Sequence, residues 1–105
     1  MIIVGGRFEL DPAQRDAFLA ERHEMMRTSR REDGCLEYTF AADPLEPGRV
    51  VLFERWESQA ALDAHLAAIS STTTVTPRSA AITLYDVTGE RPLRRPASGI
   101  DDPAP

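Results

Sequence analysis

The side chain in this sequence best suited to proton transfer is His65. It lies between Leu62 and Ile69 in a run with helical spacing, which places it on the apolar face of a predicted helix. Imidazole exchanges protons near neutral pH, so His65 is a candidate proton acceptor in catalysis. A histidine in such a position also often serves only as a buried or interface side chain, and both interpretations remain open.

Aromatic side chains could supply the walls of a site for a flat ligand. Trp56 ends a predicted strand where a helix begins, and its indole N–H could donate to an oxygen of the ligand. Tyr38 could hydrogen-bond the same kind of oxygen. The alternative for both residues is a place in the core. Further candidates for lining such a cavity, each of which could equally fill the core, are His23, Met25, Met26, Phe40, Phe53 and Tyr85.

The composition is that of a small acidic globular domain. The chain has 105 residues and a net charge of −5, and all twelve basic residues are arginine, so we expect one domain and no nucleic-acid partner. The single cysteine, Cys35, excludes an intrachain disulfide and a cysteine metal cluster, and we predict no metal site. The N-terminus lacks the features of a signal peptide, and no apolar run is long enough to span a bilayer. We therefore expect a soluble cytoplasmic protein with no membrane partner.

The first part of the chain is predicted to form a strand, a helix and a second strand. Apolar residues over 2–10 indicate the first strand. Asp11 is a good N-cap and Pro12 fits the first helical position, and the helix that follows is expected to continue until Gly34 stops it. Residues 35–41 alternate with period two, which predicts a strand. The face of this strand that we expect to be apolar carries Leu36, Tyr38 and Phe40.

The second part is predicted to repeat the pattern in another order. Residues 43–48 are rich in turn-forming types and join the second strand to a third over 49–56, which gives an antiparallel hairpin. Ser58 can cap a second helix, which ends at the polar run 70–74. Residues 82–87 are predicted to form the fourth strand.

The order βαββαβ predicts an α+β, ferredoxin-like domain over residues 1–88, in which two helices cover one face of a four-stranded antiparallel sheet. A flexible, proline-rich tail is expected over 89–105. The segments 2–4 and 50–53 are apolar on both faces of their strands, although a sheet with one solvated face should alternate. A second sheet is the simplest cover for the other face, so we expect a homodimer.

Two motifs carry a resemblance to a known family. The first is Glu54-x-Trp56-x-Ser58-x-x-Ala61-Leu62-x-x-His65-Leu66, and the second, further upstream, is Asp33-Gly34-Cys35-x-x-Tyr38. With this spacing the sequence resembles the antibiotic biosynthesis monooxygenase family of dimeric α+β barrels, over roughly residues 2–88.

The resemblance implies a cavity between sheet and helices in each subunit, and cofactor-free oxidation of an electron-rich aromatic by O₂. The substrate would be a quinol, an anthrone or a polyketide-like phenol, which itself supplies the electrons. His65 would then handle the proton, while Trp56 and Tyr38 position the ring. One alternative is a non-catalytic dimer of the same fold that binds a small molecule for another enzyme. Another is a haem-binding or haem-degrading protein.

Two departures from the family pattern bear on these alternatives. The chain contains no asparagine, a residue on which some oxygenating and haem-degrading relatives rely, and Gly5 to Arg7 occupy the stretch where the haem-degrading relatives carry it. We therefore discount haem chemistry. The segment between His65 and the last strand is also shorter than in typical members, which predicts a pocket that is either more open or vestigial. The missing asparagine and the short segment are the features that favour the binding protein, while the monooxygenase remains the leading expectation.

Two further residues are assigned structural roles. Glu54 shares a strand face with Trp56 in a strand that we expect to be buried, so its carboxylate needs a partner. We expect this partner to be Arg7, or Arg55 of the dimer mate, and Glu54 then to have a structural or dimer-fixing role. Cys35 has no activating cation nearby in the sequence and is interpreted as a half-buried strand residue.

Overall fold

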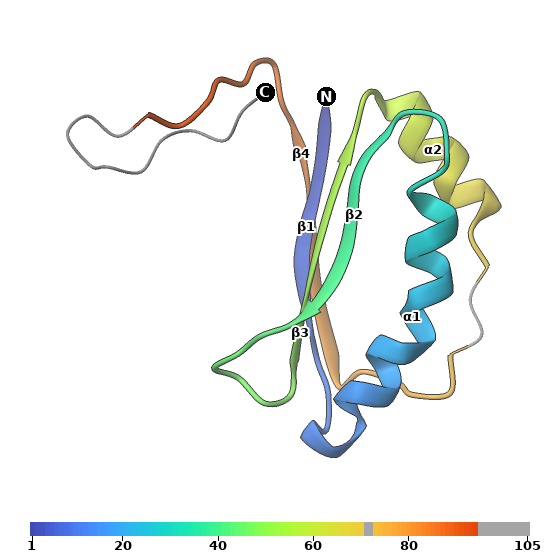
Figure 1. Cartoon of the computed structure of the whole chain (residues 1–105), viewed down its shortest axis with the longest axis vertical. Coiled ribbons are helices and arrows are strands. Elements are labelled where there is room, and N and C mark those ends of the chain that lie inside the picture. The colour runs from blue at the N-terminus through green and yellow to red at the C-terminus, as the bar shows by residue number, and fades with distance from the viewer. Residues whose placement is uncertain (71–72, 95–105) are drawn as a thin grey trace.

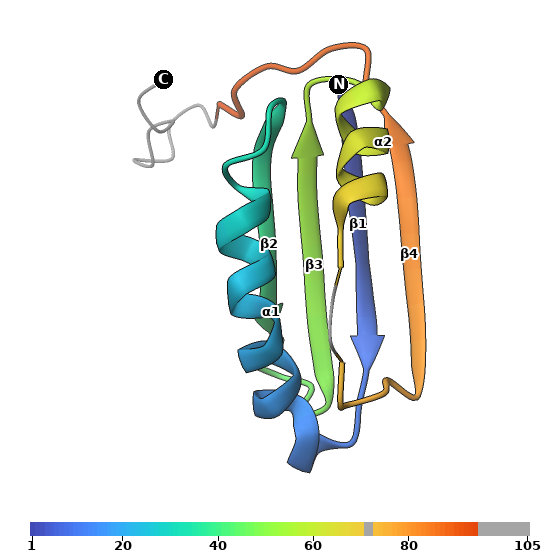
Figure 2. The same ribbon diagram turned by 90° about the vertical axis from the view of Figure 1, so that its right-hand side faces the viewer.

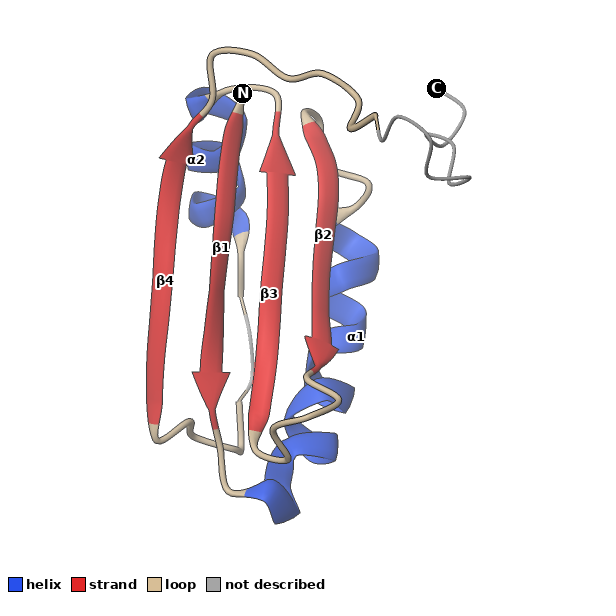
Figure 3. Ribbon diagram, turned by 90° about the vertical axis from the view of Figure 1, so that its left-hand side faces the viewer, coloured by secondary structure: helices blue, strands red, loops and turns tan. Residues whose placement is uncertain are grey.

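Four strands form one antiparallel sheet in the order β2-β3-β1-β4 (Figures 1 and 3). The computed structural model describes residues 1–70 and 73–94. Its elements are β1 (Ile2–Glu9), a 3-10 turn η1 (Pro12–Gln14), α1 (Arg15–Ser29), β2 (Cys35–Ala42), β3 (Arg49–Trp56), α2 (Gln59–Ala68) and β4 (Ser79–Asp86). This order and topology confirm the predicted ferredoxin-like α+β fold.

Both helices lie on the same face of the sheet, and the other face is open (Figure 1). Helix α1 lies over the β2–β3 side, and α2 lies beside its C-terminal half, over the β1 side (Figure 2). The strands alternate accordingly: in β3, Val50, Leu52, Glu54 and Trp56 are buried toward the helices. Val51 and Phe53, which point to the open face, are each 39% exposed.

The start of the first helix follows from its sequence. The Asp11 side chain accepts a hydrogen bond from the backbone N–H of Ala13 at 2.9 Å, and Pro12 opens a 3-10 turn that leads into α1. The helix ends at Ser29, earlier than predicted, and a turn carries the chain to Gly34. Gly34 has φ +81°, a conformation that favours glycine. A Cβ there would also lie 2.5 Å from the Ala61 Cβ, so this turn presses closely on α2.

The second helix is capped by Ser58, whose hydroxyl accepts from the N–H of Ala61 at 3.1 Å, as the sequence predicts. Its apolar stripe is narrower than expected. Leu62 and His65 are buried, but Leu66 is 58% exposed and Ile69 is 37% exposed. The helix therefore contacts the sheet along one short line that includes His65.

Two strands differ from their predicted form. A register irregularity between Cys35 and Glu37 leaves Leu36 exposed, so Leu36 does not share the buried face of Tyr38 and Phe40 as predicted. A bulge of this kind shifts the alternation by one residue. Strand β4 begins at Ser79 rather than at residue 82.

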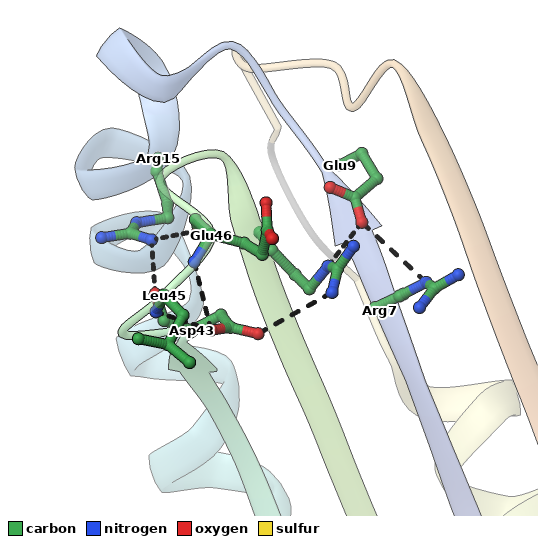
Figure 4. A network of polar contacts seen from close by, with 7 residues as sticks. Arg7, Glu9, Arg15, Asp43, Leu45 and Glu46 are labelled. Atoms are coloured by element: carbon green, nitrogen blue, oxygen red, sulfur yellow. Dashed lines mark hydrogen bonds and ion pairs between the residues drawn. The ribbon is translucent and has the colours of Figure 1, made fainter.

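A polar network holds the β2–β3 turn to the start of α1 and the end of β1 (Figure 4). Arg15 Nη1 donates to the backbone oxygens of Asp43 and Glu46, both at 2.9 Å. Arg49 Nε donates to Glu9 Oε1 at 2.6 Å. Hydrogen bonds from the backbone N–H of Leu45 and Glu46, together with nearby arginines, lower the pKa of the Asp43 carboxyl. The network fixes the length of the hairpin turn and with it the β2–β3 register.

The chain beyond β4 forms no helix or strand as far as residue 94. Glu90 reaches back to Arg55 of β3, with 3.1 Å between Oε2 and Nη1. The rest of the predicted tail, residues 95–105, lies outside the described residues. In the described part of the chain, no helix is long and apolar enough to cross a membrane.

Candidate active site

A cavity of about 360 Å³ lies between α1 and the end of α2. The α1 side of its wall is polar apart from Met25 and includes three carboxylates, Glu21, Glu24 and Glu32. The other side carries His65 and then Ala68, Ile69 and Ser70, at the end of α2 and just beyond it. His65 is therefore the predicted catalytic residue that lines the cavity.

His65 is held in a fixed orientation by a carboxylate. Its Nδ1 lies 2.7 Å from Glu32 Oε1, and the residue is 2% exposed. A carboxylate can only accept, so Nδ1 carries the proton in the neutral ring, and Nε2 is left as the acceptor. An oriented imidazole beside a carboxylate is the arrangement of a general base with its positioning residue.

Glu32 was not among the residues singled out from the sequence. It lies in the turn that follows α1, 33 positions before His65. The Gly34 turn brings it there, because that turn packs against Ala61 at the start of α2. The only feature of the sequence that pointed to this contact was Gly34. Local patterns do not predict a contact between residues 33 positions apart.

The structure brings the other two predicted catalytic residues directly beneath His65. The His65 ring centroid lies 4.7 Å from that of Trp56 and 5.1 Å from that of Tyr38. Trp56 is 0% exposed and Tyr38 is 2% exposed, and neither lines the cavity. In this structure they support the imidazole rather than form the wall of the cavity.

The indole N–H of Trp56 is already hydrogen-bonded to Glu54 and does not point into the cavity. Its Nε1–H donates to Glu54 Oε1 at 2.9 Å inside the core. Within one chain, and among the described residues, neither predicted arginine pairs with Glu54, and Arg7 instead lies 3.9 Å from Glu9. Arg55 lies on the opposite face of the sheet, where it pairs with Glu37 at 3.4 Å and with Glu90. Burial raises the pKa of the Glu54 carboxyl, while the Trp56 hydrogen bond and the charge of a protonated His65 lower it.

Tyr38 is a buried donor with a weak acceptor. Its hydroxyl donates to the sulfur of Met25 at 3.3 Å. Burial, more than the charge of Glu54, raises the pKa of Tyr38, against the effects of the Ser29 hydroxyl and Arg22. The phenol therefore stays protonated at neutral pH and can act as a hydrogen-bond donor.

The predicted lining residues divide into three groups. Met25 lines the cavity. Met26 and Phe40 lie beneath the helix, where the Met26 sulfur accepts from the Phe40 N–H at 3.4 Å, and they belong to the core. The other three do not reach the cavity: His23, Phe53 and Tyr85.

The positions of His23, Phe53 and Tyr85 on their helix and strands explain why these side chains do not line the cavity. His23 directly follows the buried Arg22 on α1 and is exposed, because one residue turns the helix face by roughly 100°. Phe53 pairs with Thr39, and Tyr85 pairs with Ile3. Both pairs point to the open face of the sheet, opposite the cavity.

Two features concern metals and redox chemistry. Among residues 1–70 and 73–94, no three histidine, cysteine or acidic side chains gather as a metal site would require. Cys35 is a free, half-buried thiol. Burial and the neighbouring carboxylates of Glu32 and Glu54 raise its pKa, which opposes formation of the reactive thiolate.

The described residues form a small α+β domain in which a buried His65–Glu32 pair lies on the wall of a cavity. Residues 1–75 match the antibiotic biosynthesis monooxygenase family, and the chain belongs to that family. The structure superposes on an antibiotic biosynthesis monooxygenase with a TM-score of 0.70 and 28% identity, covering 85% of this chain and 100% of the other.

Two further relatives are similar over part of their length. Rv0793 from Mycobacterium tuberculosis is 39% identical over 61% of this chain and 62% of its own; its structure matches with a TM-score of 0.65, 30% identity and coverage of 85% and 96%. The uncharacterized protein sll1783 from Synechocystis is 36% identical over 61% of this chain. The match spans 44% of sll1783, less than half of its length.

The buried Glu54 leads to a prediction about stability and pH. The folded state holds the Glu54 proton to a higher pH than the unfolded chain does. The protein therefore loses stability as the pH rises from the pKa of Glu54 in the unfolded chain to its raised pKa in the folded state. Above the folded-state pKa, the whole destabilisation caused by burying the charged carboxylate is present. Glu54→Gln keeps an oxygen for the Trp56 N–H and carries no charge. It should be more stable than the wild type, by an amount that grows as the pH rises.

Urea unfolding of both proteins from acidic to mildly alkaline pH checks this. Glu57→Gln, at an exposed position, is the matched control and should follow the wild type. A Glu54→Gln variant that is less stable than the wild type at the alkaline end would show that the carboxylate itself stabilises the core.

Proposed function

We propose that this protein is a cofactor-independent monooxygenase that oxidises an electron-rich aromatic, such as a quinol, an anthrone or a polyketide-like phenol, with O₂. The observation that supports this most strongly is the position of His65. It is buried on the wall of a cavity, and Glu32 on Nδ1 directs Nε2 to act as the base. A cytoplasmic location remains the expectation from the sequence.

The reaction can be written for an anthrone without any external reductant. His65 Nε2 takes a proton from the ring CH₂, and the C–H electron pair spreads over the aromatic system as a carbanion. The carbanion passes one electron to O₂, and the resulting radicals join in a C–O bond. The hydroperoxide takes up the proton and loses water, so that CH₂ and O₂ become C=O and H₂O. His65 is the catalytic residue, and Glu32 is a positioning residue that stabilises the imidazolium formed.

We further propose that two copies pair through the open face of the sheet. Val51, Phe53 and Tyr85 are 39%, 39% and 52% exposed there. Exposed apolar side chains gathered on one flat face mark an interaction surface. Gly5 lies among them without a side chain, and a Cβ at Gly5 would meet only the Tyr85 ring at 3.8 Å, so the surface has room for side chains from a partner sheet.

Oxygen uptake by the metal-free protein with hydroquinones, naphthalenediols and anthrones tests the reaction. His65→Ala should lower kcat by roughly a hundredfold or more, because a positioned proton acceptor contributes about 10²–10⁴-fold. His23→Ala is the matched control and should keep the wild-type rate, since His23 is exposed and does not line the cavity.

Full turnover by His65→Ala would contradict the assigned base. No uptake above autoxidation with any substrate, while aromatic ligands still quench Trp56 fluorescence, would contradict the enzyme and support the non-catalytic binding protein.

Light scattering at micromolar concentration tests the dimer. The wild type should have twice the mass of the chain, and Phe53→Glu should be monomeric, because it places a charge within the apolar face. Leu45→Glu, in the exposed hairpin turn, should remain dimeric. A monomeric wild type would overturn the proposal.

A further inference from the structure

Arg22 is a buried cation that forms no ion pair with any carboxylate among residues 1–70 and 73–94. It is 7% exposed, and its Nη1 is buried without a hydrogen-bond partner. Nη2 donates to Thr73 Oγ1 at 3.1 Å, and the guanidinium carbon lies 4.1 Å from the centroid of the Phe18 ring. Burial lowers the pKa of Arg22, against the effect of Glu21. A buried donor left unpaired is costly, so this position is suited to an acceptor supplied by a ligand.

A second donor with a weak acceptor, the Tyr38 hydroxyl, contacts Met25, which lies about one helical turn after Arg22 on α1. The Tyr38 hydroxyl donates to the Met25 sulfur at 3.3 Å, and a thioether is a weak acceptor. Arg22, Met25 and Ser29 follow one another at helical spacing on the inner side of α1. Met25 and Ser29 line the cavity. The Met25 side chain therefore contacts both the cavity and the Tyr38 hydroxyl, and the buried Arg22 lies one turn earlier on the same side of α1.

We propose that Arg22 and Tyr38 form an inner subsite for the ionised oxygen of the aromatic ligand, and that Met25 covers this subsite until the ligand enters. Methionine is flexible enough to move aside. The oxygen would then accept hydrogen bonds from Arg22 Nη1 and the Tyr38 hydroxyl in place of the thioether. This inference rests on the proposed function, in that an aromatic with an acidic hydroxyl occupies the cavity.

The carboxylates around the cavity already have partners of their own. Glu21 Oε2 accepts from the N–H and hydroxyl of Thr74 at 2.9 and 3.0 Å, although its Oε1 is buried without a partner. Glu24 pairs with Arg27 at 2.8 Å. The charged and titratable groups that face the subsite from α1, the following turn, β2, β3 and α2 are Glu21, Arg22, Glu24, Glu32, Tyr38, Glu54 and His65. Arg22 is the one member of this set of described residues that carries a permanent positive charge.

The chemistry at this subsite is the loss of one proton from the ligand. The O–H bond of the phenol breaks, its electron pair stays on oxygen, and water takes the proton. Hydrogen bonds from a cation and a neutral hydroxyl stabilise the phenolate over the phenol. The ligand should therefore bind as an anion, with an apparent pKa below its value in water.

Para-nitrophenol tests this, because its phenolate absorbs visible light and it does not need to react. In the presence of excess wild-type protein, its apparent pKa should fall. Arg22→Met and Tyr38→Phe should each weaken phenolate binding roughly tenfold to hundredfold, the range for losing a charge-assisted hydrogen bond. Met25→Ala should tighten it. Arg78→Met, which removes an exposed arginine outside the cavity, is the matched control.

The subsite would be overturned if para-nitrophenol does not bind, or if its apparent pKa is unshifted or raised in the presence of the protein. It would also be overturned if Arg22→Met and Tyr38→Phe both bind the phenolate with wild-type affinity. Thermal melting identifies a variant that fails to fold, and Tyr38→Phe with Met25→Ala then decides the outcome. The result is separate from that for the proposed function. Phenolate binding without oxygen uptake supports the subsite and removes the monooxygenase, and oxygen uptake without a pKa shift does the reverse.

Discussion

The hydrogen bond between His65 and Glu32 is the interaction on which the site depends. The helices α1 and α2 pack on the sheet more than on each other, so a cavity remains between them. The bond at 2.7 Å closes one end of that gap and fixes the imidazole. A buried imidazole without a partner would be costly, and the carboxylate removes that cost while it selects the tautomer.

Beneath this bond the protein keeps a second carboxylate in its core. Glu54 is 6% exposed, and its hydrogen bond comes from the Trp56 indole rather than from an arginine. Such a group is expensive to bury. Glu54 lies close enough to His65 for the two charges to interact, so in the proposed reaction an imidazolium at His65 would have both Glu32 and Glu54 near it.

The sequence was most informative where the physics is local. The starts of both helices were predicted from Asp11, Pro12 and Ser58, because capping involves residues only a few positions apart. The alternation of β3 correctly placed Glu54 and Trp56 on one face, yet Phe53 was assigned to the cavity, which lies on the face opposite to its side chain. The strand β2 alone does not reveal which residue of β3 lies opposite Phe40. That pairing depends on the turn between them, and the structure pairs Phe40 with Leu52.

The contacts that make the site are the ones a sequence reveals least. His23 was misplaced by a single step along α1, since one residue decides whether a side chain faces the core or the solvent. No local sequence pattern pointed to Glu32 or Arg22. Their contacts form only when α1 and the turn after it pack against α2 and the segment after α2. Composition and periodicity determine which faces are buried, but not which polar atoms meet there.

The tautomer of the neutral His65 ring decides whether Nε2 can act as the proton acceptor. Nitrogen-15 NMR of the imidazole, with Glu32→Gln for comparison, distinguishes the two neutral forms. We expect a proton on Nδ1 and none on Nε2 in the wild type, so that Nε2 is free to accept a proton. A neutral ring protonated on Nε2 would contradict this expectation, because Glu32 would then not be holding the imidazole in the form that can accept a proton from the ligand.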